Sequence, residues 1–243
     1  MLLLNCDLGE GFGRWQQGQD DKAMRHIDIA NIACGFHAGD PLLIQQTLTL
    51  AKKYGVKVSA HPSYPDLVGF GRRSMQIASA ELYAMIQYQI AAMAGMAATQ
   101  GLTIEYVKPH GALYNDMMKE SRILSTIMHA VSDFHLPLTL VIQADSQQSE
   151  YLQQAQALGL PLYFEAFADR RYLANGALQP RSEHGAVLKG PQILAQVKQL
   201  LETGTVTSAS GQPLALNAQT LCVHGDNDAA IDTIEQIKLL IKR

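Results

Sequence analysis

Titratable side chains recur directly after the short apolar runs of this sequence, where buried strands would end. Four of them are histidines, namely His37, His61, His110 and His224. Because the carboxyl ends of parallel strands meet on one face of an α/β fold, we expect these imidazoles to converge in one pocket. A single histidine at a strand end is usually a surface residue or a local cap, but four equivalent positions favour a functional site.

Carboxylate and cationic side chains follow the same runs or stand inside them. They are Asp7, Glu10, Lys108, Glu165, Asp169 and Arg170. An Asp or a neutral His can take a proton from water near pH 7, and Lys or Arg can stabilise an oxyanion. The glycine-rich loop 9–13 adds backbone N–H groups suited to holding an anion. The pattern predicts acid–base chemistry in one pocket, with or without a metal ion.

Several established site types are absent from the sequence. Neither the dinucleotide fingerprint GxGxxG nor the phosphate-binding loop GxxxxGK(S/T) occurs, so no standard nucleotide site is predicted. GxSxG and HExxH, which would indicate a serine hydrolase and a compact zinc site, do not occur either. Cys6, Cys34 and Cys222 are widely spaced without a CxxC pair, which excludes a disulfide framework and a zinc ribbon.

Seven short apolar runs are expected to form the strands that position these residues. Between most of them lie segments with apolar residues at helical spacing, so strand and helix alternate along the chain. This alternation indicates parallel strands with helical crossovers, in either an open sheet or a barrel. The runs are Leu2–Cys6, Ile27–Ala33, Val56–Ala60, Ile104–Val107, Leu138–Ile142, Leu162–Phe167 and Leu221–Val223.

Local signals mark helix ends and one hairpin. Asp40 precedes a proline, as at a helix start, and Gly55 follows two lysines, as at a helix end. We interpret Asp40, and likewise Asp226, as caps rather than catalytic residues. Residues 203–219 resemble a small hairpin. No linker is evident, so a single domain over residues 1–243 is expected.

Composition restricts the partners and the location. The chain has 243 residues, of which 47% are hydrophobic and 17% charged, and its formal net charge is -3. Lys and Arg are scattered, so no basic patch is predicted to bind nucleic acid. No apolar run approaches the roughly 18 residues of a membrane span, and the first residues do not resemble a signal peptide. We expect a cytoplasmic protein that binds neither nucleic acid nor membrane.

Long motifs around these strand ends resemble one known family over nearly the whole chain, in order. The sequence resembles the LamB/YcsF family of 5-oxoprolinase A subunits. The motifs are too long and specific for a chance match. They are NCDLGEGFG from Asn5, ANIACGFHAGD from Ala30, AHPSYPD from Ala60, GFGR from Gly69, VKPHGALYN from Val107, EAFADR from Glu165 and CVHGD from Cys222.

The resemblance implies a fold, a reaction and partners. The fold is an α/β architecture, an irregular seven-stranded (β/α) barrel of the glycoside hydrolase/deacetylase type, which agrees with the seven runs. The reaction is hydrolytic ring opening of the cyclic amide 5-oxo-L-proline (pyroglutamate) to L-glutamate, with ATP as co-substrate and together with subunits B and C. The residues at matching motif positions are Asp7, Glu10, His37, His61, Lys108, His110, Asn115, Glu165, Asp169, Arg170, His224 and Asp226.

The resemblance does not assign individual roles, so we infer them from chemistry. Asp7 or His61 would activate water, and Lys108 with the glycine-rich loop would hold the anionic oxygen. Arg72 or Arg170 would bind the substrate carboxylate. We therefore group Asp7, Glu10, His61, Lys108 and His110 as catalytic. The substrate-binding group is His37, Arg72, Asn115, Glu165, Asp169, Arg170 and His224; Arg171 and His184 fall outside the pattern and are left out.

Two other functions remain open. In a metal-dependent amide hydrolase of the deacetylase type, Asp7, His37 and His61 would bind zinc or another divalent ion and activate water. In a regulatory module, the pocket would bind a sugar or another metabolite, but such a module does not need so many titratable groups. Metal analysis of the purified protein distinguishes the metal-dependent hydrolase from the 5-oxoprolinase subunit. Turnover with partner subunits distinguishes both enzymes from the regulatory module.

Overall fold

Seven parallel strands close into a barrel in the computed structural model, which describes residues 2–15, 19–224 and 228–241. Their order around the barrel is β1-β2-β3-β4-β5-β6-β9. Each strand overlaps one of the seven predicted runs, so the predicted (β/α) barrel is confirmed. The strands are β1 (Leu3–Leu8), β2 (Ile29–Ala33), β3 (Lys57–His61), β4 (Ile104–Val107), β5 (Thr139–Gln143), β6 (Leu162–Phe167) and β9 (Thr220–Val223).

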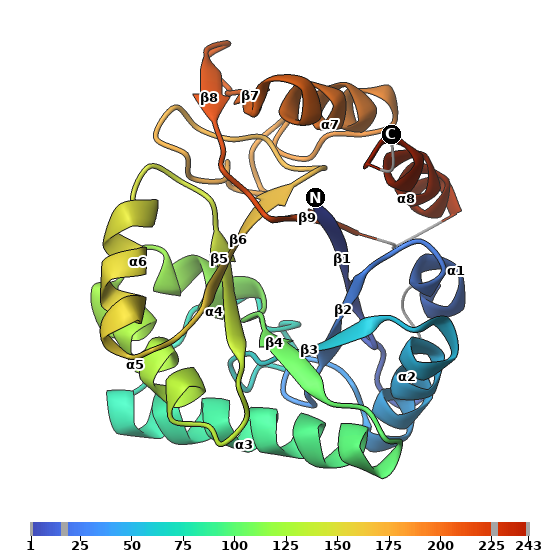
Figure 1. Ribbon diagram of the computed structural model, residues 1–243, viewed down its shortest axis with the longest axis vertical. Coiled ribbons are helices and arrows are strands. Elements are labelled where there is room, and N and C mark those ends of the chain that lie inside the picture. Colours follow the sequence, from blue (N-terminus) through green and yellow to red (C-terminus); the bar gives the residue numbers. More distant parts are fainter. Residues whose placement is uncertain (1, 16–18, 225–227, 242–243) are drawn as a thin grey trace.

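Helices surround the barrel on its outside (Figure 1). A two-stranded antiparallel hairpin of β7 (Thr205–Thr207) and β8 (Pro213–Ala215) precedes β9, which confirms the predicted hairpin. The barrel is irregular because the register between β3 and β4 shifts at Val58 and Ser59. The helices are α1 (Asp20–Met24), α2 (Pro41–Tyr54), α3 (Ser79–Thr99), α4 (Gly111–Met117), α5 (Ser121–Ser132), α6 (Gln148–Ala157), α7 (Pro191–Thr203) and α8 (Asp228–Ile241).

Both predicted signals at the ends of α2 are confirmed. Asp40 Oδ1 accepts the backbone N–H of Leu42 at 3.0 Å, which satisfies a helix N–H that has no partner within the helix. Gly55 ends α2 with a φ of +66°, in the left-handed region that glycine adopts without steric cost. Asp40 is therefore a structural cap. Asp226, which we also interpreted as a cap, lies outside the described residues.

Strand alternation divides the barrel interior into two layers. Near the amino ends of the strands lies a small apolar cluster, the apolar plug, separate from the main core between barrel and helices. It consists of Leu3, Ile29, Tyr106, Val141 and Tyr163. Since alternate side chains of a strand share a face, the next inward position lies two residues further along. On these five strands it carries a buried polar residue, and these residues form the polar layer: Asn5, Asn31, Lys108, Gln143 and Glu165.

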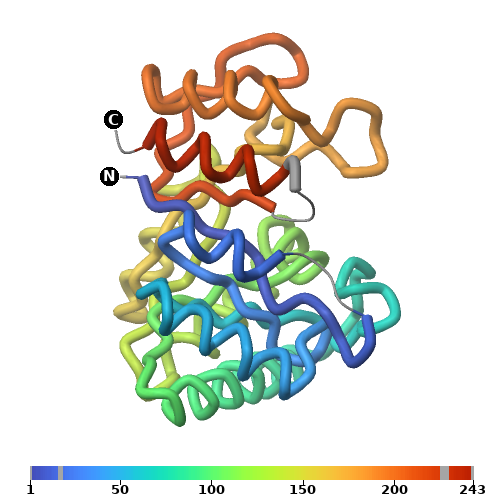
Figure 2. Tube along the Cα trace, turned by 90° about the vertical axis from the view of Figure 1, so that its right-hand side faces the viewer, coloured from blue at the N-terminus to red at the C-terminus, as the bar shows by residue number. Residues whose placement is uncertain are grey.

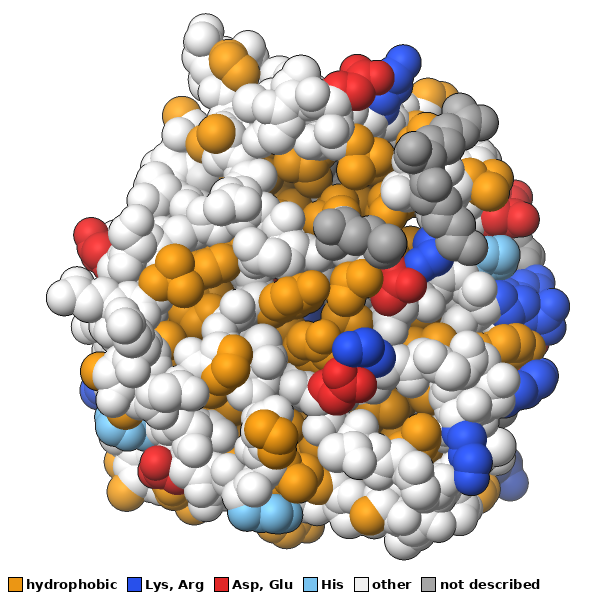
Figure 3. Space-filling view, in the orientation of Figure 1, with side chains coloured by type: hydrophobic (Ala, Val, Ile, Leu, Met, Phe, Trp, Pro, Cys, Tyr) orange, Lys and Arg blue, Asp and Glu red, His pale blue; other side chains and the backbone are white. Residues whose placement is uncertain are grey.

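The two ends of the barrel differ in what covers them. The start of β1 and the end of α8 lie on one side, and the loops that follow β1, β3 and β6 project on the other (Figure 2). At the amino-terminal end, hydrophobic side chains gather over the middle of the face and most charges lie toward its rim (Figure 3). At the carboxyl end, by contrast, the long loops after β1, β3 and β6 surround the place where the predicted site residues meet.

Two further expectations concern the cysteines and membranes. Cys6, Cys34 and Cys222 are all buried and free. Within residues 2–15, 19–224 and 228–241, no helix has the length and hydrophobicity needed to cross a membrane.

Candidate active site

A cavity of about 550 Å³ opens at the carboxyl ends of the barrel strands. Most of the predicted site residues line it, and the polar layer forms part of its floor. The predicted residues in its lining are Asp7, Glu10, His61, Arg72, Lys108, His110, Asn115, Arg170 and His224. The remaining three, His37, Glu165 and Asp169, are buried and each contacts a lining residue from behind.

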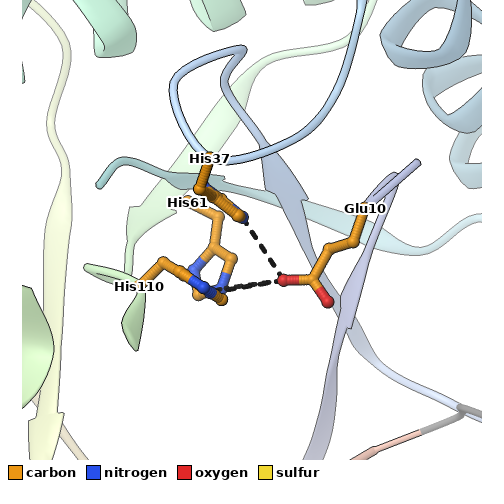
Figure 4. A group of neighbouring side chains, drawn as sticks. All are labelled: Glu10, His37, His61 and His110. Carbon is orange, nitrogen blue, oxygen red and sulfur yellow. Dashed lines mark hydrogen bonds and ion pairs between the residues drawn. The ribbon is translucent and has the colours of Figure 1, made fainter. Parts of the chain in front are cut away.

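Three imidazole rings gather around one carboxylate oxygen (Figure 4). Glu10 Oε1 lies 3.2 Å from His110 Nδ1, 3.3 Å from His37 Nε2 and 3.9 Å from His61 Nε2. The His37 ring stacks on His110 with 3.7 Å between centroids, while His61 stands nearly perpendicular to both. Gly71 lies against this stack at a φ of +64°, and a Cβ there would come within 2.8 Å of the His110 ring. Only glycine fits this close approach.

Burial governs the charge of this group. It lowers the pKa of His37 to about 3 and also holds the pKa of His110 below its ordinary value. Burial opposes the charge on Glu10 as well, but its contacts with His110 and His37 outweigh burial and keep the pKa of this carboxyl low. At neutral pH the ionised Glu10 carboxylate therefore lies against neutral rings of His37 and His110.

Lys108 connects the strand ends through four short contacts inside the barrel, one of them to Cys222 Sγ at 3.1 Å from its Nζ. Its Nζ lies 2.9 Å from Asp7 Oδ1, 3.0 Å from Glu165 Oε1 and 3.2 Å from Asn5 Oδ1. An ammonium group has three N–H donors, so each of them has a protein acceptor. Asp7 Oδ1 also accepts a hydrogen bond from Asn31 Nδ2 at 2.8 Å. Lys108 thus fixes the Asp7 carboxylate from below.

This arrangement keeps Asp7 and Lys108 charged although both are buried. Burial disfavours a charge on Lys108, but Asp7 outweighs it and raises the pKa of the ammonium group well above its usual value. Burial likewise disfavours the Asp7 carboxylate, but His61 and Lys108 hold its pKa well below the usual value. In Glu165 burial prevails over Lys108 and raises the pKa of the carboxyl. Lys108 is therefore the cation of this network, and Asp7 is the anion that pairs with it.

A second carboxylate orients His224 on the opposite side of Asp7. Asp169 Oδ2 lies 2.8 Å from His224 Nδ1, and His224 Nε2 points toward Asp7 Oδ2 at 4.0 Å. Burial opposes a charge on the ring, but Asp169 outweighs burial and raises the pKa of His224. Arg181 Nη2 donates to His224 Nε2 at 3.2 Å and acts against that rise. Burial lowers the pKa of His37 and His110, whereas Asp169 outweighs burial and raises that of His224.

Arg170 offers a buried cation for an anionic ligand. Its side chain is only 7% exposed, and its Nη2 donates to the carbonyl oxygen of Gln179 at 2.6 Å. Its Nε has no hydrogen-bond partner among the described residues. Burial and Arg181 lower the pKa of this guanidinium to about 10, so it stays charged at neutral pH. A buried N–H without a partner is costly, and Arg170 also lines the cavity, where its charge can attract an anionic ligand.

Three amides of the glycine-rich loop, which was expected to hold an anion, already have protein partners. Gly9 N–H donates to Asp20 Oδ2 and Gly13 N–H donates to Asp40 Oδ2, both at 2.9 Å. Phe12 N–H donates to the carbonyl oxygen of Trp15 at 2.7 Å. These hydrogen bonds shape the loop so that it presents the Glu10 side chain rather than these three amides.

Sequence reasoning missed three charged residues of the cavity lining, Lys119, Asp145 and Arg181. Arg181 lines the cavity from the loop after β6, where neither a motif nor a periodic pattern points to this arginine. The two residues excluded from the site, Arg171 and His184, are not part of the cavity lining. Asn5 and Asn31 stand inside the quoted motifs, and the structure adds that they hold Glu165, Lys108 and Asp7 in place.

Comparison with known proteins identifies the family. The LamB/YcsF family description matches residues 2–243. The chain belongs to the LamB/YcsF family. The A subunit of a 5-oxoprolinase from Vibrio cholerae serotype O1 is 50% identical over 238 residues, which cover 98% of this chain and 96% of that protein. A 5-oxoprolinase A subunit from Pseudomonas putida, numbered 2 in its name, is 49% identical over 240 residues, covering 98% and 92% of the two chains.

A solved structure supports the fold. The lactam utilization protein from Thermus thermophilus superposes with a TM-score of 0.90 at 36% sequence identity, covering 99% of this chain and 97% of that chain. The predicted family and the predicted barrel are therefore both confirmed. The relatives are named as subunits, which indicates that they act in multi-subunit proteins.

Proposed function

We propose that this chain opens the lactam ring of 5-oxo-L-proline to give L-glutamate, as one subunit of an ATP-dependent 5-oxoprolinase with subunits B and C. The observation that carries the proposal is the placement of His61 and His224 on two sides of the Asp7 carboxylate, at 3.4 and 4.0 Å. A hydrolysis that breaks a C–N bond needs a base for water and an acid for the leaving nitrogen. The names of the relatives give the substrate class.

The substrate carboxylate would bind to Arg170. This cavity-lining guanidinium has an Nε–H without a partner among the described residues, and charge-assisted hydrogen bonds to carboxylates are strong. Arg72 lines the same cavity and would contribute a second cationic contact. Binding the carboxylate at the arginines would orient the lactam carbonyl carbon toward Asp7 and His61.

Water would be activated between Asp7 and His61. The Nδ1 of His61 lies 2.6 Å from the carbonyl oxygen of Lys108, which can only accept, so the proton is on Nδ1 and the lone pair is on Nε2. That lone pair lies on the side of Asp7 Oδ2 and can take a proton from water. Asp7 is held ionised by Lys108 and His61, and it would orient the water and stabilise the imidazolium that forms.

The ring nitrogen would leave with a proton from His224. As water adds to the carbonyl carbon, the C–N bond breaks and the nitrogen becomes the free amine of glutamate. Asp169 fixes the orientation of the His224 ring and favours its protonated form, which suits a general acid. Transfer of a phosphoryl group from ATP to the lactam oxygen, with release of ADP, would make the unreactive amide carbon more electrophilic. Water addition and C–N cleavage would then give an acyl phosphate, which a second water hydrolyses to glutamate and inorganic phosphate. The chain lacks a standard phosphate-binding motif for the phosphoryl transfer.

A glutamate-release assay tests the proposal. The chain alone, subunits B and C alone, and all three together are each incubated with 5-oxo-L-proline and ATP. We expect glutamate only from the complete set, because the chain lacks a recognisable ATP site. Efficient ATP-dependent ring opening by the isolated chain would contradict the expectation that the chain needs subunits B and C to use ATP. No glutamate from the complete set would contradict the proposed reaction.

A substitution of Arg170 tests the substrate orientation within the same assay. Hydrogen bonds to charged groups contribute about 1.5–3 kcal/mol, so Arg170→Gln should raise KM by roughly 10- to 100-fold. Arg171→Gln, which removes a neighbouring arginine outside the cavity lining, is the matched control and should leave KM unchanged. An unchanged KM in Arg170→Gln would mean that the substrate carboxylate does not bind to Arg170.

A further inference from the structure

Two neighbouring imidazoles have one ring nitrogen each fixed as a donor. His61 Nδ1 lies 2.6 Å from the carbonyl oxygen of Lys108, and His110 Nε2 lies 2.9 Å from the carbonyl oxygen of Phe70. A carbonyl oxygen can only accept a hydrogen bond, so both of these nitrogens carry the proton. In the neutral rings, His61 Nε2 and His110 Nδ1 then both present lone pairs.

These two lone pairs face each other next to a carboxylate. His61 Nε2 and His110 Nδ1 are 3.0 Å apart, and Glu10 Oε1 lies 3.2 Å from His110 Nδ1 and 3.9 Å from His61 Nε2. Three buried acceptor atoms that face one another are unfavourable unless a proton or a metal ion lies between them, and the attraction between Glu10 and His110 requires one of the two. A cation at their centre turns all three contacts into attractive ones.

We propose that Glu10, His61 and His110 bind a divalent transition-metal ion such as Zn²⁺. In a tetrahedral zinc site with metal–ligand distances of about 2.0–2.1 Å, donor atoms lie about 3.3–3.4 Å apart. The three observed separations of 3.0, 3.2 and 3.9 Å bracket that value, so small adjustments complete the site. Two imidazoles and one carboxylate are also ligands that suit zinc.

The surroundings of the rings match those of metal-binding histidines. A ligating histidine usually donates its other N–H to a carbonyl or carboxylate, which fixes its tautomer and orientation. Both His61 and His110 do so, through the carbonyl oxygens of Lys108 and Phe70. All three proposed ligands line the cavity, so the remaining coordination position faces a ligand or water. An ion bound there would occupy the Nε2 lone pair of His61 and would polarise a ligand oxygen or acidify a bound water, and Asp7 would then take the proton of that water in place of His61.

His37 and Asp7, which the sequence suggested as metal ligands beside His61, have other partners. The His37 ring is parallel to His110 within 6° and stacked on it, so an ion in the plane of His110 lies out of the plane of His37. His37 therefore supports Glu10 from behind, 3.3 Å from Oε1. Asp7 Oδ1 already accepts from Lys108 and Asn31, and Asp7 Oδ2 lies 3.4 Å from His61 Nε2 and 4.0 Å from His224 Nε2. Glu10 Oε1, by contrast, lies within 3.9 Å of both facing ring nitrogens of His61 and His110. The geometry thus favours Glu10 and His110 as the partners of His61.

Metal binding by the isolated chain tests this inference without substrate or partner subunits. The protein is stripped with a chelator and titrated with Zn²⁺ against a chromophoric chelator, and Co²⁺ is added separately to record visible absorption. We expect one Zn²⁺ per chain and Co²⁺ bands typical of a four- or five-coordinate site. No Zn²⁺ affinity and no Co²⁺ bands in the wild-type chain would overturn the proposal and leave a proton shared between His61 and His110.

Three variants locate the site. His110→Ala and Glu10→Gln should each weaken Zn²⁺ binding by more than about 100-fold, whereas His37→Asn should weaken it by about 10- to 100-fold, as is typical for a residue that supports a ligand. His129→Ala, an exposed histidine in α5, is the matched control and should bind Zn²⁺ like the wild type. Circular dichroism of each stripped variant checks folding. Wild-type affinity in both His110→Ala and Glu10→Gln would overturn the assignment.

The two proposals can fail separately. If the chain binds Zn²⁺ but the reconstituted complex releases no glutamate, the metal site stands and the proposed reaction is wrong. If glutamate is released and the stripped chain binds no metal, the reaction stands and the metal site is wrong.

Discussion

The two layers of the barrel interior differ sharply although the same five strands build both. The apolar plug contains only aliphatic and tyrosine side chains, while the polar layer two residues further along contains two asparagines, a glutamine, a lysine and a glutamate. A step of two residues keeps the side chain inside the barrel and moves it about 6.5 Å toward the cavity. The inward positions of one strand are therefore divided between stability at the amino end and chemistry at the carboxyl end.

The comparison explains how charges are held inside this barrel. Burying an aliphatic or aromatic side chain contributes about 1.5–3 kcal/mol, whereas burying an unpaired charge is costly. Lys108 avoids that cost because two carboxylates and an asparagine receive its three N–H groups. The plug closes the other end of the barrel, so it can stabilise the strands without contacting the cavity. Substitutions in the two layers should therefore have different consequences.

The largest effect is expected at the cavity, from loss of the proposed base. His61→Ala should lower the kcat of glutamate release by about 10²- to 10⁴-fold, the usual contribution of a general base, and Asp7→Asn should fall in the same range. The measurement is steady-state turnover of the reconstituted complex. His129→Ala is the control and should change kcat by less than about twofold, because a surface substitution away from the site touches no chemistry. Full activity in His61→Ala would remove this residue from the mechanism.

The next effect concerns the buried charge of the polar layer. Lys108→Met leaves Asp7 and Glu165 without their cation, and breaking a buried ion pair by removing one partner costs about 3–5 kcal/mol. Urea denaturation should show this loss in the free energy of unfolding. Lys198→Met, an exposed lysine of α7, should stay within about 0.5 kcal/mol of the wild type. If Lys108→Met were as stable as this control, the network would not hold the layer together.

A substitution in the apolar plug should separate stability from activity. Ile29→Ala removes a side chain that is 1% exposed, and such truncations cost about 2–5 kcal/mol in the free energy of unfolding. We expect kcat and KM of the folded protein to change by less than about twofold, because no plug residue lines the cavity. Leu42→Ala at an exposed position of α2 is the control for stability. A large fall in kcat for Ile29→Ala would show that the layers are coupled.

Much of the barrel could be predicted because its strands are short apolar runs bounded by turn residues. Ile104–Val107 and Leu162–Phe167 coincide with β4 and β6 at both ends. The order in which the strands pair could not be predicted, because β9 pairs with β1 and β6 through contacts between distant parts of the chain. Those pairings depend on how the whole sheet curves and closes, which no local pattern encodes.

The candidate site was predictable in its residues and less so in their partners. Strand ends converge in a parallel barrel, and this brought His61, His110 and His224 to one cavity as expected. Whether a side chain lines the cavity or lies behind it depends on packing, so the position of His37 behind His110 could not be read from the sequence. The amides of the glycine-rich loop likewise bind Asp20 and Asp40, which follow much later in the chain.

The smallest effect expected is a pH dependence of stability from His224 and Asp169, which lie at the carboxyl end of the barrel. Burial opposes the charge on His224, but Asp169 outweighs it and raises the pKa of the ring; for Asp169, His224 outweighs burial and lowers the pKa of the carboxyl. The contribution of the raised His is complete below its unfolded pKa of about 6.5 and is lost as pH rises through the folded value. That of Asp169 is lost as pH falls below about 4.

The pair should therefore stabilise the protein most between about pH 4 and 6.5, and less at pH 9. The measurement is the difference in the free energy of unfolding between the wild type and His224→Asn, followed from pH 6 to pH 9 in chelator. Asp7 at 4.0 Å favours the charged ring as Asp169 does, and Arg181 at 3.2 Å opposes it, so Arg181→Gln should extend the stabilisation to higher pH. Since the other titrating histidines are present in both proteins, their contributions cancel in the difference. A difference that stays constant over this range would mean that His224 is neutral in the folded protein, which would also remove it as the general acid.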